Sequence, residues 1–342
     1  MKQIQPKNKE PTKIAYISDL HGFNYVNEIV KKINKENVSL VVLGGDFTDY
    51  TQNGTIKIVK AFLKLDLDIL IMPGSHENFE VYENIFNKIK NKKLIDGYKH
   101  NYLKIGDYEL IIISGSSTVV AGIPRMRGGS YWQIERGVNK KKTQREANKK
   151  LKERKISRKG RLIFMDDIFD LTKKHISKTP SSKKIILSHN PPLCKTNKGI
   201  DLAIFGIITE TFKLKKEHKN KKEFQEIKND ELFEKGQVLT LDEIKILQKY
   251  KYPVKIMKKN VGSKDISILM NKYNITKIIS GHIHESGKRA INKQEKKVKE
   301  NQWTKDVRIN SGEGKKGLFT IIKLGNQGRI KYEFIKVRKN KN

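Results

Sequence analysis

The chain has very little cysteine and no long apolar segment. Its 342 residues contain one cysteine, Cys194, so no disulfide can form within the chain. No run of about 18 apolar residues occurs, which argues against a transmembrane helix. The polar start, residues 1–12, lacks the apolar centre of a secretory signal. These absences predict a cytoplasmic protein with no membrane partner.

Acidic residues are also scarce. Lys and Arg number 72 against 37 Asp and Glu, which leaves a formal net charge of +35. Internal ion pairs cannot balance such an excess, so the chain either repels itself or attracts polyanions. Nucleic acid is therefore one candidate partner, and a lysine-rich composition without such a partner is the alternative. The sequence indicates no oligomeric state.

Apolar runs that alternate with helical patterns indicate a parallel α/β core. The predicted strands are 14–17, 39–43, 68–72, 184–187 and 277–279, and the first predicted helices are 24–36 and 56–65. Side chains able to bind metal follow these strands. Sheets of this kind place their sites past the carboxyl ends of the strands, so these side chains are expected to meet.

Five blocks carry these side chains, and each is weak when taken alone. They are Asp19-x-His21, Gly45-Asp46, Gly74-Ser75-His76-Glu77, His189 and Gly281-His282-x-His284. In an extended segment, residues i and i+2 project to the same side, so the members of each Asp/His or His/His pair can face one ion. Carboxylate and imidazole ligands suit Mn, Fe or Zn. A single block is more typical of a capped turn, whereas the five together indicate a metal centre.

The order of these blocks resembles the calcineurin-like metallophosphoesterase superfamily, whose pattern is D-x-H, G-D, G-N-H-[DE], H and G-H-x-H. The resemblance covers roughly residues 14–324, and the run 189–192 is similar to that of small prokaryotic phosphoesterases. It implies a four-layer α/β/β/α sandwich of two mixed β-sheets. We expect one such domain at 13–337, with basic insertions at about 125–180 and 211–260. Residues 1–12 and 338–342 are expected to be tails.

The resemblance also implies two divalent metal ions and a role for each block. The implied ligands are Asp19, His21 and His284 for the first ion, His189 and His282 for the second, and Asp46 as the bridge. His76 is implied to lie beside the phosphate and help the leaving oxygen depart, with Glu77 available to orient its ring. The alternative for His76 is a structural, hydrogen-bonded histidine. Because the metals supply the electrophile and a bridging hydroxide, no Ser or Cys nucleophile is required.

One position departs from the pattern. Ser75 stands where the superfamily has an Asn that binds the second metal through its amide oxygen. A hydroxyl is shorter and a poorer neutral ligand, so we expect the second site to be weakened. Asn78 is close in sequence and is the alternative ligand.

The function predicted is metal-dependent hydrolysis of a phosphate ester. A phosphodiester is favoured because of the charge, with a nucleotide or nucleic acid as the substrate. The alternatives are a phosphomonoesterase and a catalytically weak binding or scaffold protein, an option that Ser75 keeps open.

Residues 139–160 contain eleven Lys/Arg against two Asp/Glu. Such insertions either contact nucleic acid or form solvated faces. Asp201 is expected on the surface, with a contact to substrate or metal-bound water as the alternative.

Overall fold

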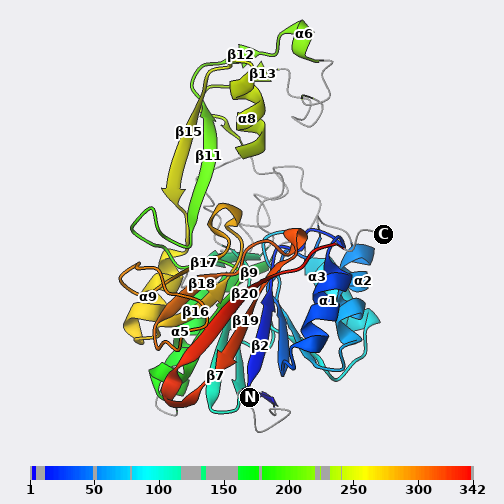
Figure 1. Ribbon diagram of the computed structural model, residues 1–342, viewed down its shortest axis with the longest axis vertical. Coiled ribbons are helices and arrows are strands. Elements are labelled where there is room, and N and C mark those ends of the chain that lie inside the picture. The colour runs from blue at the N-terminus through cyan, green and yellow to red at the C-terminus, as the bar shows by residue number, and fades with distance from the viewer. Residues whose placement is uncertain are drawn as a thin grey trace.

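The computed structural model describes most of the chain (Figure 1). The described residues are 2–4, 12–48, 52–77, 79–116, 132–135, 161–176, 179–219, 224, 232–239 and 241–339. Asn78 and the basic stretch at 139–160 lie outside them. Within the described ranges, no helix is long and apolar enough to cross a membrane.

One sheet contains the N-terminal half of the predicted α/β pattern. Its strand order is β20-β19-β2-β3-β4-β5. The strands are β2 (Lys13–Ile17), β3 (Leu40–Leu43), β4 (Asp68–Ile71), β5 (Leu94–Asp96), β19 (Leu318–Leu324) and β20 (Ile330–Lys336). β2 to β5 are parallel, and β19 and β20 add antiparallel strands beside β2. The helices α1 (Val26–Lys35), α2 (Gln52–Leu63) and α3 (Phe79–Lys88) cover its outer face (Figure 1).

The second sheet has the order β1-β6-β7-β10-β16-β18-β17. Its strands are β1 (Lys2–Ile4), β6 (Tyr102–Ile105), β7 (Tyr108–Ile113), β10 (Lys184–Ser188), β16 (Lys277–Ser280), β17 (Arg289–Ile291) and β18 (Val307–Asn310). β7, β10, β16 and β18 run parallel. β6 is antiparallel to β7, and β17 is antiparallel to β18. The helices α5 (Met165–Ile176) and α9 (Lys264–Lys272) supply buried residues to the core outside this sheet.

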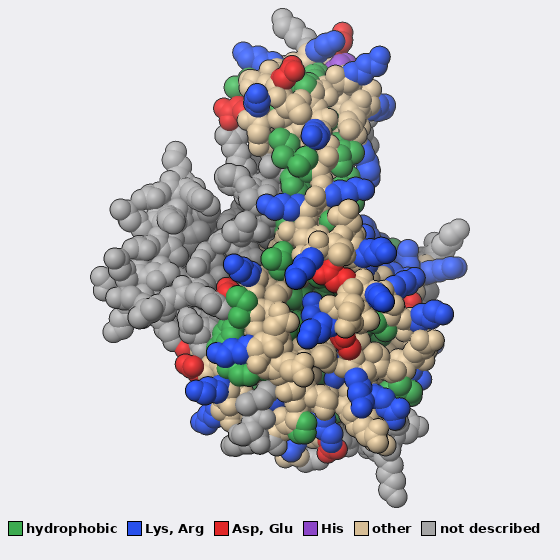
Figure 2. All heavy atoms as spheres, turned by 90° about the vertical axis from the view of Figure 1, so that its left-hand side faces the viewer, with side chains coloured by type: hydrophobic (Ala, Val, Ile, Leu, Met, Phe, Trp, Pro, Cys, Tyr) green, Lys and Arg blue, Asp and Glu red, His purple; other side chains and the backbone are tan. Residues whose placement is uncertain are grey.

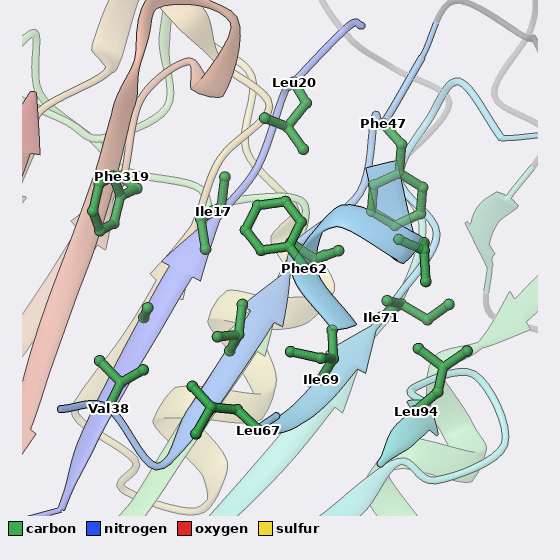
Figure 3. Packing of buried hydrophobic residues seen from close by; sticks show 14 of the residues in the cluster. Ile17, Leu20, Val38, Phe47, Phe62, Leu67, Ile69, Ile71, Leu94 and Phe319 are labelled. Atoms are coloured by element: carbon green, nitrogen blue, oxygen red, sulfur yellow. The ribbon is translucent and has the colours of Figure 1, made fainter. Parts of the chain in front are cut away.

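Alternation along the strands separates the inner and outer cores. On β2, Ile14 and Tyr16 belong to the core between the sheets, and Ala15 and Ile17 belong to the core beneath the helices. Figure 3 shows Ile17 and its neighbours on that outer side. Two mixed sheets packed face to face with helices outside both confirm the predicted four-layer α/β/β/α sandwich.

The N-terminal end differs from the expectation of a tail. Residues 2–4 form β1 and pair in parallel with β6. Ile4 is 1% exposed, because it enters the core between the sheets.

In the first insertion, β8 (Trp132–Glu135) pairs with β9 (Arg161–Phe164), and α5 follows directly. Ile168 and Phe169 of α5 are buried, so the end of this basic segment belongs to the sandwich.

The second insertion forms a folded arm, which we define as residues 201–262. Its elements are β11 (Leu202–Ile208), β12 (Phe212–Lys213), α6 (Lys216–Lys219), β13 (Leu232–Phe233), β14 (Val238–Leu239), α8 (Leu241–Lys249) and β15 (Val254–Asn260). The long strands β11 and β15 carry it away from the body of the molecule (Figure 1). A small core around Ile208, Phe233 and Ile244 stabilises its outer half. The short helices η1 (Ser181–Lys183), η2 (His284–Ser286), η3 (Gly314–Lys316) and η4 (Asn326–Gly328) complete the described elements.

Lys184 and Lys277 are the first residues of β10 and β16 in the second sheet, and both are fully buried. Lys184 forms an ion pair with the buried carboxylate of Glu109. Lys277 instead donates to the carbonyl of Ser182 at 2.6 Å. Burial lowers the pKa of Lys277 from its ordinary 10.5 to about 8. Its positive charge therefore costs folding free energy at neutral pH.

Replacement of Lys277 by Met is expected to stabilise the fold at pH 7 by about 1–3 kcal/mol, less than the full pKa shift because the bond to Ser182 is lost. Between pH 8 and 10.5 the folded native chain has released this proton while the unfolded chain retains it. The native stability therefore rises with pH relative to the variant. Urea unfolding of both proteins from pH 7 to 9.5 measures the difference, and a gap that widens with pH would contradict this account.

Candidate metal centre

The predicted metal ligands and the predicted catalytic His76 lie past the carboxyl ends of five strands. Asp19 and His21 follow β2, Asp46 follows β3 and His76 follows β4, all in the first sheet. His189 follows β10, and His282 and His284 follow β16 in the second sheet. Because β2, β3 and β4 are parallel, and β10 and β16 are parallel, the ligands of each sheet emerge at one edge.

The first cluster contains Asp19, His21 and His284, whose ligand atoms lie within 4.8 Å of one another. The Nε2 atom of His284 is 3.3 Å from Oδ1 of Asp19. The rings of His21 and His284 meet edge to face, with centroids 5.3 Å apart. The structure thus brings together the three side chains predicted for the first ion.

The second cluster contains Asp46, His189 and His282, again within 4.8 Å. The Nε2 atom of His189 lies 3.3 Å from Oδ2 of Asp46 and 3.0 Å from Nδ1 of His282. Two ring nitrogens this close share either a proton or a cation. One carboxylate and two imidazoles are a donor set that suits Zn, Mn or Fe, so these residues fit a divalent metal.

A third cluster joins the other two. It contains His21, Asp46 and His76, so it shares His21 with the first cluster and Asp46 with the second. The Nε2 atom of His76 is 3.8 Å from Oδ2 of Asp46, and its ring centroid is 4.8 Å from that of His21. Asp46 therefore lies where the second and third clusters meet, and its role as a bridge between two ions stays a prediction.

Hydrogen bonds orient the histidine rings. Nδ1 of His189 lies 2.9 Å from the carbonyl of Gly44 and donates to it, which leaves the Nε2 lone pair for a metal. In the same way, Nδ1 of His284 lies 3.4 Å from Oε2 of Glu313 while Nε2 is directed at Asp19. A hydrogen-bond partner on the ring nitrogen that faces away from the metal is the usual way to fix the tautomer of a metal-binding histidine.

The electrostatics of the site favour positive charge. Burial opposes ionisation of Asp46, yet the neighbouring histidines, His189 above all, hold its pKa well below the usual range. Burial likewise disfavours the charged ring of His189, but the carboxylates of Asp46 and Asp19 outweigh it and raise its pKa to about 9. Burial and the neighbouring His189 lower the pKa of His282 to about 3. A proton and a metal ion therefore compete for the same buried nitrogens.

The ligand-bearing backbone adopts conformations that side chains rarely take. Asp19, His21, Asp46 and His282 all have positive φ, between 43° and 68°. A positive φ is uncommon in residues other than glycine. Residues with a positive φ concentrate at functional sites, where surrounding contacts hold the strain. Here the amides of Asp19 and His21 donate to the carbonyls of Gly45 and Asp46, both at 3.0 Å. The first two ligand loops are thus bonded directly to each other.

Two glycines allow these loops to come close together. A Cβ atom on Gly74 would overlap Oδ1 of Asp46, and one on Gly281 would overlap Oδ2 of Asp19. Both carboxylates therefore lie against bare backbone. This is the physical reason for a glycine at the start of the third and fifth blocks.

Glu77 lies beneath the site and bonds to backbone. Its carboxylate accepts the amides of Asp46 at 3.1 Å, Phe47 at 2.6 Å and Gly74 at 2.7 Å, and the residue is 2% exposed. It holds the second and third blocks together. The expected role in orienting the ring of His76 stays a prediction.

Ser75 contacts the shared carboxylate. Its hydroxyl donates to Oδ2 of Asp46 at 2.8 Å, and its amide donates to Oδ1 at 2.6 Å. The amide of His76 donates to the same Oδ1 at 2.9 Å. The serine hydroxyl thus lies beside the oxygen that faces His189, at the edge of the second cluster.

Two residues of the site were missed by sequence reasoning. Asn310 is fully buried and donates to the carbonyls of Gly281 and Ile283, which bracket His282. Glu313 contacts His284, as described above, and its carboxylate also pairs with Lys315 at 3.1 Å. Asn310 is the last residue of β18, whereas Glu313 lies three residues past it, so the rule that located the other ligands would have found Glu313.

Asp201 was expected on the surface, and this was wrong. It is fully buried, and its Oδ2 accepts the amides of Cys194 at 3.0 Å and Gly262 at 2.9 Å. The carboxylate joins the loop after His189 to the end of the arm. Burial raises its pKa.

Replacement of Glu77 by Gln is expected to destabilise the fold by about 2–3 kcal/mol, since its amide group cannot accept all three backbone N–H bonds. Urea unfolding measures this loss, with Glu80→Gln on the exposed face of α3 as the matched control. Equal stability of the two variants would show that the three bonds do not hold the loops together.

The sequence of the chain matches the profile of a known protein family. The profile of the family described as Calcineurin-like phosphoesterase matches residues 12–209, more than half of the chain. No curated protein matches the chain by sequence.

Solved structures resemble the chain at low identity. A protein from Thermus thermophilus is 10% identical, with a TM-score of 0.48, and the match covers 96% of this chain and 100% of that one. A dimetal phosphatase from Danio rerio is 11% identical, with the same TM-score and coverage. A protein serine/threonine phosphatase from Saccharomyces cerevisiae is 8% identical, with a TM-score of 0.38 and coverage of 100% and 85%. The assignment rests on the sequence profile: the chain belongs to the calcineurin-like phosphoesterase family.

Proposed function

We propose that this metal-dependent phosphoesterase hydrolyses a phosphodiester with two divalent ions held side by side. The observation that carries the proposal is the sharing of residues between the three clusters. Asp46 and His21 link a site of Asp19 and His284 to a site of His189 and His282. When bound, two such ions stabilise charge on the phosphoryl oxygens and make hydroxide available at neutral pH.

The chain's own residues supply the remaining functions. Asp46 orients both sites because its two oxygens are held by the amides of Ser75 and His76 and by the serine hydroxyl. The side chain of His76 is 21% exposed at the rim, where it can give a proton to the leaving oxygen. The net charge of +35 favours a substrate with repeated phosphates, hence a phosphodiester over a small phosphomonoester.

Variants of Asp46 and His76 are expected to separate metal binding from proton transfer. Asp46→Asn removes the shared charge, so both metal content and turnover should be lost. His76→Ala should lower kcat by about 10²- to 10⁴-fold while metal content stays intact. Hydrolysis of a bis-aryl phosphodiester with added Mn, together with metal analysis of each protein, measures the two effects.

The control for these variants is His100→Ala, which removes an exposed histidine away from the clusters. It should leave both quantities unchanged. Equal metal loss in the Asp46 and His76 variants would remove the catalytic role proposed for His76. Native protein with bound metal but no turnover on any phosphate ester would refute the proposed enzyme function.

Ser75 supports the second candidate function, a catalytically weak binding protein on the same fold. Its hydroxyl is engaged with Oδ2 of Asp46 at 2.8 Å, and it brings no amide oxygen to the second cluster. The second ion would then be held by Asp46, His189 and His282 without a fourth side chain of the kind the family supplies. The affinity of that site decides between the two functions.

Replacement of Ser75 by Asn is expected to tighten the weaker of two Mn-binding steps by roughly tenfold, because the amide oxygen adds a ligand. Calorimetric titration of the native and variant proteins measures both steps, and the bis-aryl phosphodiester assay shows whether turnover rises with occupancy. Unchanged affinity would mean that the serine already completes the site.

A further inference from the structure

The two long strands of the arm form a ribbon with two different faces. β11 pairs with β15 in antiparallel register, so directly opposed residues share a face. Gly206 marks one face, because a Cβ atom there would collide with Ile244 of α8. Phe205 and its partner Met257 mark the other, which we call the Phe205 face.

The Phe205 face meets the loop that carries two predicted metal ligands. Ala203, Phe205 and Val261 form one buried cluster with Ile283, the residue between His282 and His284. The hydroxyl of Ser286 donates to the carbonyl of Leu202 at 2.6 Å, which adds a polar contact at the same place. The root of this face is therefore continuous with the metal centre.

Two exposed lysines extend this face outward. Lys259 is opposite Ala203, and Lys255 is opposite Ile207, so the register places both on the Phe205 face. Lys258 is equally exposed but opposes Ile204, on the other face. Neither β11 nor β15 contains an acidic residue. Figure 2 shows basic and hydrophobic side chains along the middle of the arm, with acidic ones nearer its outer end.

The spacing of the two lysines favours an anion with repeated phosphates. Four residues of extended strand separate them by about 13 Å. With both side chains extended from the sheet, the two ammonium groups can each contact a different phosphate of a chain with repeated phosphates, which a single phosphate group does not offer. Partly buried Ile207 and Met257 on the same face provide an apolar surface beside that chain.

We propose that the Phe205 face of the arm binds the backbone of a nucleic-acid strand through Lys255 and Lys259 and leads it to the metal centre. Hydrolysis of the bound strand rests on the proposed phosphodiesterase function, whereas binding of the strand to the arm does not. It gives the arm a role that the ligand clusters do not require, because none of their members lies on the arm.

Binding of a labelled single-stranded oligothymidylate by the full-length protein tests this directly. Measured by fluorescence anisotropy at low salt, Lys255→Glu and Lys259→Glu should each weaken binding by about tenfold, whereas Lys258→Glu, with the same charge change, should alter it less than twofold. The doubly neutral variant Lys255→Gln/Lys259→Gln should reduce the slope of log K against log salt by about 1.4, near 0.7 for each lost phosphate contact.

Turnover of the small bis-aryl phosphodiester separates this proposal from the proposed function. All of these variants should retain native turnover, which also shows that they fold. Absence of oligonucleotide binding by the native protein, or equal weakening by Lys258→Glu, would overturn the assignment of this face. Normal oligonucleotide binding by metal-loaded protein that hydrolyses neither the oligonucleotide nor any other phosphate ester would instead refute the enzyme function and leave the binding face intact.

Discussion

The carboxylate of Asp46 is the group on which the rest of the site depends. Buried at 2% exposure, it keeps its charge because amides and a hydroxyl from the third block and the ring of His189 surround it. Those partners come from loops after β4 and β10, in different sheets. A single buried charge therefore requires the two halves of the sandwich to meet at one edge, and burial of apolar residues between the sheets supplies the free energy for that meeting.

The loops at this edge are held by hydrogen bonds more than by apolar packing. Positive φ at several ligands costs on the order of 1 kcal/mol each, and bonds between loops offset that cost. Glu77 joins two loops by accepting three backbone amides, and the side-chain amide of Asn310 donates to two carbonyls of the loop around His282. These residues make the ligand positions rigid before a metal binds, which is what a preorganised site needs.

The part of this arrangement that can be predicted from sequence is the part governed by local pattern. Buried parallel strands end at one edge, so residues such as Asp19 and His189 could be placed without knowledge of the fold. Asn310 and Asp201 could not, since their partners lie far away in sequence and an isolated Asn or Asp has no periodic signal. The second insertion was expected either to contact nucleic acid or to form a solvated face, and neither expectation included a core. Sparse apolar residues such as Phe233 and Ile244 suffice for a small core because strand pairing collects them.

The geometry of the arm explains how the sandwich carries an insertion between His189 and His282. Leu202 pairs with Asn260, so the chain leaves and returns at one point. Asp201 closes that point through the amide of Gly262, and the ligand loops on either side need not move to admit the insertion. Because the described strands of the arm leave and return to the body at this place, its surface can change without a change of ligand. The chemistry at the edge of the sheets and the selection of the substrate can thus be separate properties of one chain.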